Sequence, residues 1–410
     1  MTELLIPAGS PEVLKTAVRY GADAVYVGGE EFSLRAKAKN FTKEQLAWAV
    51  GYCHERGKKL YVTANIIAHN RDLAEAREYF ESLNEIGPDA VIIADAGMFA
   101  IAKKMLRPEI AIHISTQANN VNSETFRFWY DLGASRVVCG RELSLGEIAQ
   151  IRSELPEGAE IEAFVHGAMC IAYSGRCLMS AYFTGREANL GACTHPCRWN
   201  YYVTEETRPG EYVPVSENER GTFLFSSKDL CAIGLIPDLI RAGVDSFKVE
   251  GRMKTALYVA TVARAYRMAI DAAVQGLQEY EAVLPRAVEE LGRCGGRGYT
   301  TGFFLGKPDT AAQTYESSAV TSEAVFLGII DCVEPDGCAW FLQKNKFAVG
   351  DTIEFMKPDG TDVAAKVLSM WDEDGNEIAD CPHPSVRVKA KFSAVPEIGD
   401  VMRLTEGNAR

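Results

Sequence analysis

The sequence predicts an α/β protein with a TIM-like (β/α)8 barrel, a long cysteine-bearing insertion between strands seven and eight, and a small C-terminal β-barrel domain. The first observation behind this prediction is a phrase that occurs four times. Gly21-Ala-Asp-Ala-Val-Tyr-Val-Gly-Gly returns in altered form at residues 87–95, 133–141 and 243–251. In each copy a glycine ends a helical stretch, and a short apolar run follows that is typical of a parallel strand covered on both faces. Strands that alternate with helices predict a parallel sheet.

The second observation is the number of these strands. We expect strands near residues 3–7, 23–28, 59–66, 90–94, 110–115, 136–140, 161–166 and 246–250. We expect helices at 11–20, 43–57, 73–86, 96–106, 122–132, 144–154, 233–242 and 255–274. Eight strands with intervening helices favour a closed barrel over an open sheet. The connections between successive strands are short except for the one from about 167 to 245, and long connections in compact domains are usually functional.

The third observation is a change of pattern after residue 275. Residues 279–292 look helical, and a glycine-rich connector follows at 293–302. Short strands are then expected at 324–330, 351–355, 362–367 and 386–390. We therefore expect a barrel domain at 1–275, a helical and glycine-rich connector at 276–319, and a small β-barrel domain at 320–410.

Composition restricts the functional classes. The chain of 410 residues carries a net charge of −13, which argues against broad electrostatic capture of nucleic acid but is compatible with a local basic groove. We find no apolar run that predicts a membrane span and no secretory signal, so we expect a cytoplasmic protein. In that reducing compartment, the 11 cysteines cannot form a disulfide framework.

Four cysteines lie within 28 residues of the long insertion, with the spacing C-x6-C-x15-C-x3-C: Cys170, Cys177, Cys193 and Cys197. Four thiolates are the ligand set of a [4Fe-4S] cluster or of a structural zinc ion. The spacing is neither that of a ferredoxin nor that of a zinc ribbon. By spacing alone, an iron–sulfur cluster, a zinc site and unrelated core cysteines therefore remain alternatives. Cys53 and Cys139 are expected in the core, and Cys231 is a spare candidate ligand.

Polar side chains follow several strands, at the end of the barrel where active sites form. His166 ends the seventh strand and Glu250 follows the eighth, so both are catalytic candidates. The alternatives are a packing role for His166 and an Arg–Glu pair for Glu250. Three cations are candidates for substrate binding: Arg141, Arg252 and Lys228. The guanidinium groups of the two arginines can bind a carboxylate or phosphate with paired donors.

The chain also contains Glu162-x-Phe-x-x-Gly-Ala-Met-Cys-x4-Gly-x-Cys-x-x-Ser, together with Leu5-Ile-Pro-Ala-Gly-Ser, Ser227-Lys-Asp-Leu and Lys248-Val-Glu-Gly-Arg-Met-Lys. These motifs resemble those of the collagenase-like peptidase family, the thirty-second of the unassigned catalytic class. The resemblance covers most of residues 1–275, and the C-terminal β-module resembles that of the family.

Within the family, the chain is most similar to the branch that hydroxylates tRNA to 5-hydroxyuridine at wobble position 34. The resemblance implies an oxygen-independent enzyme with prephenate as co-substrate. It also implies a [4Fe-4S] cluster with four cysteine ligands: Cys170, Cys177, Cys193 and Cys197. The alternatives are a collagenase-like peptidase, or a related hydroxylase acting on ribosomal RNA or a ubiquinone precursor. The sequence has neither a His-Glu-x-x-His helix nor a Gly-x-Ser-x-Gly elbow, which weighs against hydrolysis.

Overall fold

The computed structural model of the protein describes residues 2–33, 40–170, 172–173, 175–199, 202–203, 213–214, 226–295, 298–308, 312–314, 324–381 and 384–405. The chain divides into two compact units, each assembled from several segments. The first unit contains residues 1–11, 23–253 and 296–320, and the second contains 12–22, 254–295 and 321–410. None of the helices in these described ranges is long and apolar enough to cross a membrane.

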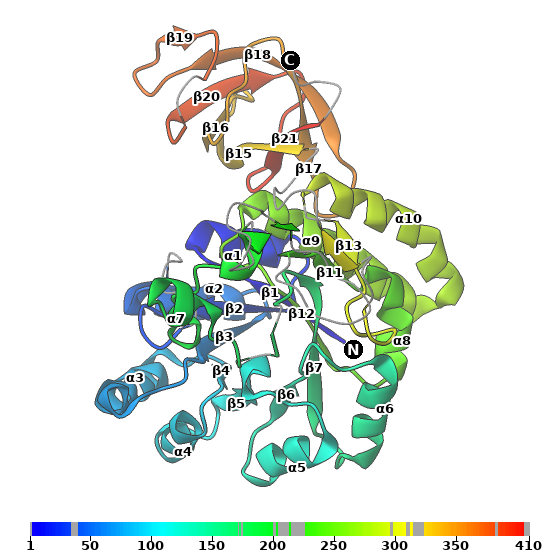
Figure 1. Ribbon diagram of the computed structural model, residues 1–410. Coiled ribbons are helices and arrows are strands. Elements are labelled where there is room, and N and C mark those ends of the chain that lie inside the picture. The colour runs from blue at the N-terminus through cyan, green and yellow to red at the C-terminus, as the bar shows by residue number, and fades with distance from the viewer. Residues whose placement is uncertain are drawn as a thin grey trace. The chain divides into compact units, whose positions relative to one another are not determined.

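A closed barrel of eight parallel strands forms the first unit and confirms the predicted fold class (Figure 1). The strands are β1 (Glu3–Pro7), β2 (Ala24–Gly28), β3 (Lys59–Ala64), β4 (Ala90–Ile93), β5 (Ala111–Ile114), β6 (Arg136–Val138), β7 (Glu160–Gly167) and β12 (Ser246–Val249). Each strand pairs with the next, and Ser246 of β12 is in register with both Glu3 of β1 and Glu162 of β7. This double pairing of β12 closes the sheet.

The helices around the barrel of the first unit are α2 (Lys43–His54), α3 (Leu73–Ile86), α4 (Ala96–Met105), α5 (Ser123–Asp131), α6 (Leu145–Glu154) and α8 (Ile236–Arg241). Capping residues mark the ends of several of them. Thr42 and Ser144 each form a capping box, which satisfies backbone N–H groups at the start of α2 and α6. Gly87 has a φ of 72° and ends α3, as the repeated phrase predicts.

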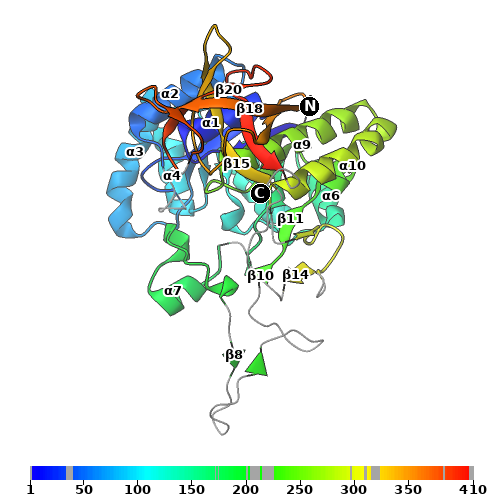
Figure 2. The same cartoon turned by 90° about the horizontal axis from the view of Figure 1, so that it is seen from above.

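The insertion between β7 and β12 contains regular structure that the sequence did not predict. The short helix α7 (Met179–Thr184) stands clear of the helices around the barrel in Figure 2. The strand β11 (Asp229–Cys231) runs antiparallel to the end of β7, with Leu230 opposite Gly167, and β13 (Tyr299–Thr300) pairs with β11. The insertion therefore returns to the barrel sheet before α8 begins.

The second unit combines three helices with an antiparallel β-barrel. The helices are α1 (Pro11–Arg19, of which residues 12–19 belong to this unit), α9 (Ala256–Gln275) and α10 (Leu277–Arg293). The barrel strands are β17 (Thr352–Met356), β21 (Val401–Thr405), β15 (Ala324–Val333), β16 (Ala339–Leu342), β20 (Arg387–Phe392) and β18 (Val363–Trp371), and β17 also pairs with β18. The edge strand β19 (Glu377–Ile378) extends the sheet.

Apolar side chains from alternate positions fill this small barrel, including Phe341, Phe355 and Phe392. The sequence predicted β15, β17, β18 and β20 but not β16, β19 or β21. The two units are each assembled from separate stretches of chain, so the linear domain boundaries stay a prediction.

Candidate functional site at the carboxyl ends of the barrel strands

The cysteine-bearing segment, residues 168–199, lies across the carboxyl ends of the barrel strands. The backbone N–H of Ile67, in the connection after β3, donates to Asn189 O at 3.1 Å. Gly175 approaches the connection after β5 so closely that a Cβ there would lie 2.4 Å from Gln117 O. Its φ of 76° also favours glycine. In barrels of this type the carboxyl-terminal face holds the active site, so this face is the candidate site.

None of the four cysteines of the segment takes part in a disulfide within the described residues. Cys170 is exposed, and Cys177, Cys193 and Cys197 are half-buried. Within the described ranges, however, Cys, His, Asp and Glu side chains nowhere form a group of three or more that could hold a metal ion. The structure thus places the four thiols in one segment without gathering their sulfur atoms, and their role as metal ligands stays a prediction.

His195 lies beside Cys193 in the segment. Its backbone N–H donates to Cys193 Sγ at 3.4 Å, and its Nδ1 lies 3.9 Å from the same sulfur. The residue has a φ of 56°, a left-handed conformation that costs about 1–3 kcal/mol in a residue other than glycine. Pro196 and Cys197 follow in a short 3-10 helix, Pro196–Arg198. The strained turn keeps Cys193 close to the chain that carries Cys197.

The two catalytic candidates lie on neighbouring strand ends. His166 is 1% exposed, and its ring centroid lies 5.4 Å from that of Tyr299. The backbone N–H of Glu250 donates to His166 O at 2.8 Å. A Cβ at Gly167 would lie 2.6 Å from Glu250 O, so glycine permits this approach of β7 to β12. The structure therefore brings the backbones of His166 and Glu250 into contact. The catalytic roles of their side chains stay predictions.

Arg141 connects β7 with the start of the cysteine-bearing segment. Its guanidinium carbon lies 4.0 Å from the centroid of the Phe164 ring, and Nη1 donates to Ala168 O at 2.5 Å. The Nε atom is buried and has no hydrogen-bond partner within the described part of the chain. Stacking and one hydrogen bond therefore hold the guanidinium group in place.

Arg252 lies on the opposite side of the barrel, beside β2 and β3. Its Nη1 donates to Ser33 Oγ at 2.6 Å and to Thr63 Oγ1 at 3.0 Å. A Cβ at Gly28 would lie 2.0 Å from Nη1, so only glycine leaves room for this buried arginine at the end of β2. Lys228 lies instead near β13, where its methylene carbons approach Gly298. The three predicted cations are thus distributed around the barrel mouth, and their joint binding of one anion stays a prediction.

Three further polar groups lie at this face, and two of them, on Asn119 and Tyr79, were missed by sequence reasoning. Gln117 Oε1, Asn119 Oδ1 and Tyr79 Oη are buried and have no hydrogen-bond partner among the described residues. Burial raises the pKa of Tyr79, so its hydroxyl keeps its proton. A Cβ at Gly29 would lie 2.5 Å from Tyr79 Oη. The Gly28-Gly29 pair at the end of β2 was the sequence signal that could have indicated this close approach. Unmet polar groups of this kind concentrate at functional sites.

Asn119 carries a second mark of a functional site, because its φ is 62°. It ends the short 3-10 helix Thr116–Ala118 after β5, and Phe32, after β2, has a φ of 55°. Together with His195, these are three of the four non-glycine residues with positive φ in the described chain. Backbone strain is therefore concentrated in the connections at the carboxyl ends of the strands.

Beneath the site, the barrel interior holds a buried ionic network. Arg136 donates to Glu3 at 2.5 Å and to Glu162 at 3.1 Å, and Lys248 donates to Glu162 at 2.6 Å. Burial alone would raise the pKa of Glu3, but Arg136 outweighs it and holds that pKa below its usual range. Each interior charge is paired, which is the condition under which buried charges are tolerated. We interpret the network as structural, since it lies toward the amino ends of the strands.

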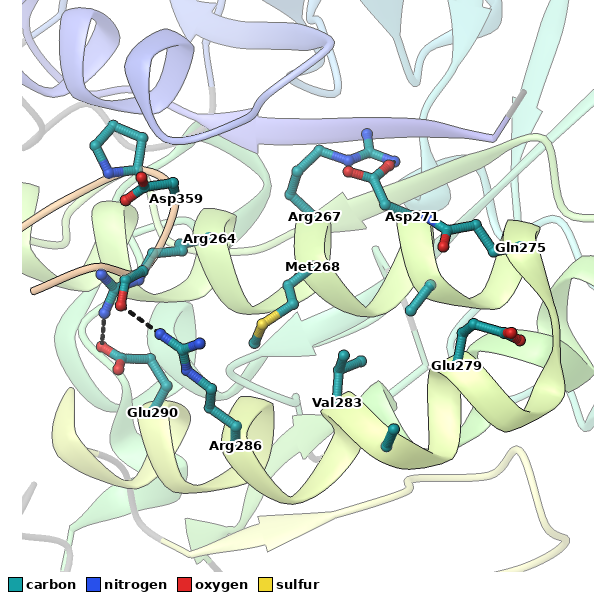
Figure 3. A pocket seen from close by; sticks show the side chains of 14 residues that line it. Arg264, Arg267, Met268, Asp271, Gln275, Glu279, Val283, Arg286, Glu290 and Asp359 are labelled. Carbon is teal, nitrogen blue, oxygen red and sulfur yellow. Dashed lines mark hydrogen bonds and ion pairs between the residues drawn. The ribbon is translucent and has the colours of Figure 1, made fainter.

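The second unit contains a cavity of about 540 Å³ between α9, α10 and the turn after β17 (Figure 3). Its arginines are engaged by neighbours within the same unit. Arg264 pairs with Glu290, Arg267 pairs with Asp271, and Arg286 donates to Gly360 O. None of the predicted site residues lines this cavity. We therefore place the candidate site on the barrel face and not here.

Comparison with known proteins gives a consistent result over both units. The model of Peptidase family U32 matches residues 9–314, and that of the Peptidase family U32 C-terminal domain matches residues 322–403. The tRNA hydroxylation protein P1 of Bacillus subtilis is 39% identical over 402 residues, which are 98% of this chain and 94% of that protein. The tRNA hydroxylation protein P of Escherichia coli is 39% identical over 398 residues, covering 87% of this chain and 86% of its own. A collagenase of Porphyromonas gingivalis is 33% identical over 377 residues, 89% of each chain.

Proposed function

The chain belongs to peptidase family U32, and we propose that it is a tRNA-modifying enzyme that hydroxylates carbon 5 of the uridine at wobble position 34. One observation carries this proposal: the chain is 39% identical, over 98% of its length, to a relative named for tRNA hydroxylation. A shared fold alone would be weak support for a shared function. Here the likeness includes the cysteine-bearing segment on the face where barrel enzymes hold their substrates.

The proposal includes a [4Fe-4S] cluster held by Cys170, Cys177, Cys193 and Cys197. The chemistry of the donor set supports it, because none of the four cysteines is in a disulfide and all four have some exposure, on one segment. When bound, such a cluster would supply electron transfer at the barrel mouth.

Prephenate is proposed as the co-substrate, in a reaction that does not use molecular oxygen. Prephenate is a dicarboxylate, and Arg141 and Arg252 are the guanidinium groups that we propose bind its carboxylates. Lys228 would add a third positive charge on the β13 side of the mouth. The buried Nε of Arg141 supports the binding of a carboxylate, because this donor has no hydrogen-bond partner among the described residues.

His166 and Glu250 are the groups we propose for proton transfer. Both lie at strand ends that meet beside the cysteine-bearing segment. His166 is held in a buried position, where an imidazole can give or take a proton without exchange with bulk water. Their order of action depends on the bound substrate, and both assignments rest on position.

The test is analysis of tRNA from cells that lack the protein. We expect deletion of the gene and of any paralogue to remove 5-hydroxyuridine and its derivatives from position 34, as measured by mass spectrometry of digested tRNA. Wild-type protein should restore the modification, and Cys170→Ala should not. Cys53→Ala is the matched control, because Cys53 is buried in α2 away from the segment.

Three outcomes would contradict the proposal. Unchanged modification of wobble uridine would reject the tRNA assignment. Loss of a hydroxylated base from ribosomal RNA, or accumulation of an unhydroxylated quinone precursor, would assign the chain to a related hydroxylase instead. Cleavage of collagen by the purified protein, abolished by Cys170→Ala, would favour the peptidase.

A further inference from the structure

The cysteine-bearing segment exposes an unusual group of aromatic rings. Tyr182 and Phe183 lie in α7 and are 84% and 44% exposed, and Trp199 is 45% exposed. The rings of Phe183 and Trp199 have centroids 6.1 Å apart, and those of Tyr182 and Phe183 are 5.1 Å apart in an edge-to-face arrangement. Single exposed apolar residues are common, but a contiguous aromatic group indicates a binding surface.

We propose that Tyr182, Phe183 and Trp199, here called the aromatic platform, stack against unpaired bases of the RNA substrate. This inference rests on the proposed function and adds to it the surface that holds the RNA. Bases in loops can be turned outward and stacked on aromatic side chains, which is the usual way in which proteins read single-stranded RNA. A wobble uridine lies in such a loop.

Charge supports RNA as the occupant of the platform. Residues 168–199 contain three arginines and one acidic residue, a net charge of +2 in a chain whose total is −13. Arg176 and Arg186 are exposed. The acidic residue, Glu187, has Oε2 3.9 Å from Nε2 of the His69 imidazole. Phosphate contacts require local positive charge, and this segment supplies it beside the rings.

The platform is tied to the cysteines by a group of hydroxyls. Thr194 Oγ1 lies 3.1 Å from both Ser180 Oγ and Thr184 Oγ1, and the backbone N–H of Thr194 donates to Ser180 Oγ at 3.1 Å. These bonds attach α7 to the residue that directly follows Cys193. A base stacked on the platform would therefore be held beside the cysteine-bearing turn.

The first experiment measures RNA affinity. The probe is a fluorescent anticodon stem-loop, compared with a fully paired RNA of equal length, and binding is followed by anisotropy. We expect Tyr182→Ala/Phe183→Ala to weaken binding of the stem-loop by roughly ten- to a hundred-fold, with a smaller effect on the duplex. Trp48→Ala is the matched control, since exposed Trp48 forms another ring pair with half-buried Tyr52, 5.2 Å apart, with Arg56 over Tyr52.

The second experiment reports direct contact. Stem-loop binding should quench tryptophan fluorescence of the wild type, because base stacking quenches an indole. Trp199→Phe should keep the affinity and lose the quenching, since a ring remains but the reporter is gone. Four other tryptophans stay in place as an internal reference.

The outcomes separate this inference from the proposed function. Unchanged stem-loop affinity in the double variant, or quenching that persists in Trp199→Phe, would overturn the platform even if tRNA hydroxylation is established. A variant that becomes monomeric while binding RNA normally would assign the rings to contact between two copies of this chain, which also overturns it. Loss of affinity with wild-type iron content would support the platform, whatever base is finally modified.

Discussion

His113 lies inside the barrel among cationic side chains and is therefore held in its neutral form. Its ring makes an edge contact with that of Tyr61, with centroids 4.8 Å apart. Burial lowers the pKa of His113 well below 6.5, and the charges of Arg136, Lys248 and Lys59 lower it further. Protonation would place an additional positive charge beside Arg136 in a site with no water to solvate it. This single side chain couples barrel stability to pH.

The first prediction at this scale concerns stability below neutral pH. In the unfolded chain His113 binds a proton as pH falls below about 6.5, whereas the folded barrel does not. The free energy of unfolding should therefore fall with pH in that window, by up to about 1.4 kcal/mol per pH unit. His113→Phe keeps an aromatic ring and should remove this slope in urea unfolding experiments.

The control is His54→Gln, because His54 is an exposed histidine paired with Asp89 at 3.0 Å. That variant retains His113, so the part of the slope that His113 supplies should remain. The depressed pKa of Glu3 acts in a separate window, since its contribution is lost only as pH falls below about 4.5. Parallel curves for wild type and His113→Phe between pH 7 and 5 would show that the buried imidazole is not the coupled group.

At the scale of elements, the connection from β7 to β12 separates two kinds of cysteine. Cys53 and Cys139 are buried in the helical and strand layers, and burial raises the pKa of each thiol to about 12. A thiol that resists ionisation is a poor metal ligand, because metals bind the thiolate. The cysteines of the connection are half-buried or exposed. The placement of each element thus determines which thiols are available.

We predict that the four cysteines of the connection act as one ligand set. Protein purified without air should be brown and carry about four irons per chain. Alanine at Cys170, Cys177, Cys193 or Cys197 should remove most of the iron, as measured by metal analysis and visible absorbance. Cys139→Ala should retain it, since that thiol is 3% exposed.

Cys231 provides the sharpest check of the fourth ligand. It lies in β11 opposite His166, at the end of the same connection. Full iron in Cys197→Ala together with loss in Cys231→Ala would replace Cys197 by Cys231 in the ligand set. Zinc in place of iron would make the site structural and remove its redox role.

At the scale of the whole molecule, the second unit is assembled around Arg403. This side chain is fully buried and donates to Glu290 at 2.6 Å, to Glu354 at 2.8 Å and to Asp362 at 3.1 Å. Its partners come from α10, β17 and the connection before β18, so one residue joins the helices to the β-barrel. Burial would raise the pKa of Glu290, but Arg403 and Arg264 outweigh it and hold that pKa below its usual range.

We predict a large loss of stability when this connection is broken. Arg403→Met leaves three carboxylates without their shared cation, so the free energy of unfolding of the second unit should fall by about 3 to 5 kcal/mol. Chemical denaturation measures this free energy of unfolding. Arg387→Met is the control, because Arg387 and Asp331 form an exposed pair 3.5 Å apart, and we expect a change within about 1 kcal/mol. Equal losses in both variants would contradict the central role of Arg403.

The sequence by itself determined the elements of the barrel and their order. The eight strands and their helices lie within a few residues of the predicted ranges, because periodicity, caps such as Thr42 and turn glycines such as Gly87 act over short stretches. Motifs in the same stretches identified the family. The four cysteines and the strand-end cations were named as candidates for the same reason, since residue type and spacing are visible without a fold.

Only the tertiary structure decided which distant segments meet. The pairing of β12 with both β1 and β7, the return of β11 to the end of β7, and the burial of Arg403 depend on contacts between residues far apart in the chain. Short strands such as β16 and β21 were missed because a strand is stabilised by its partners more than by its own sequence. The aromatic platform was missed for a similar reason. The exposure of a side chain depends on what packs against it in the fold and not on its neighbours in sequence.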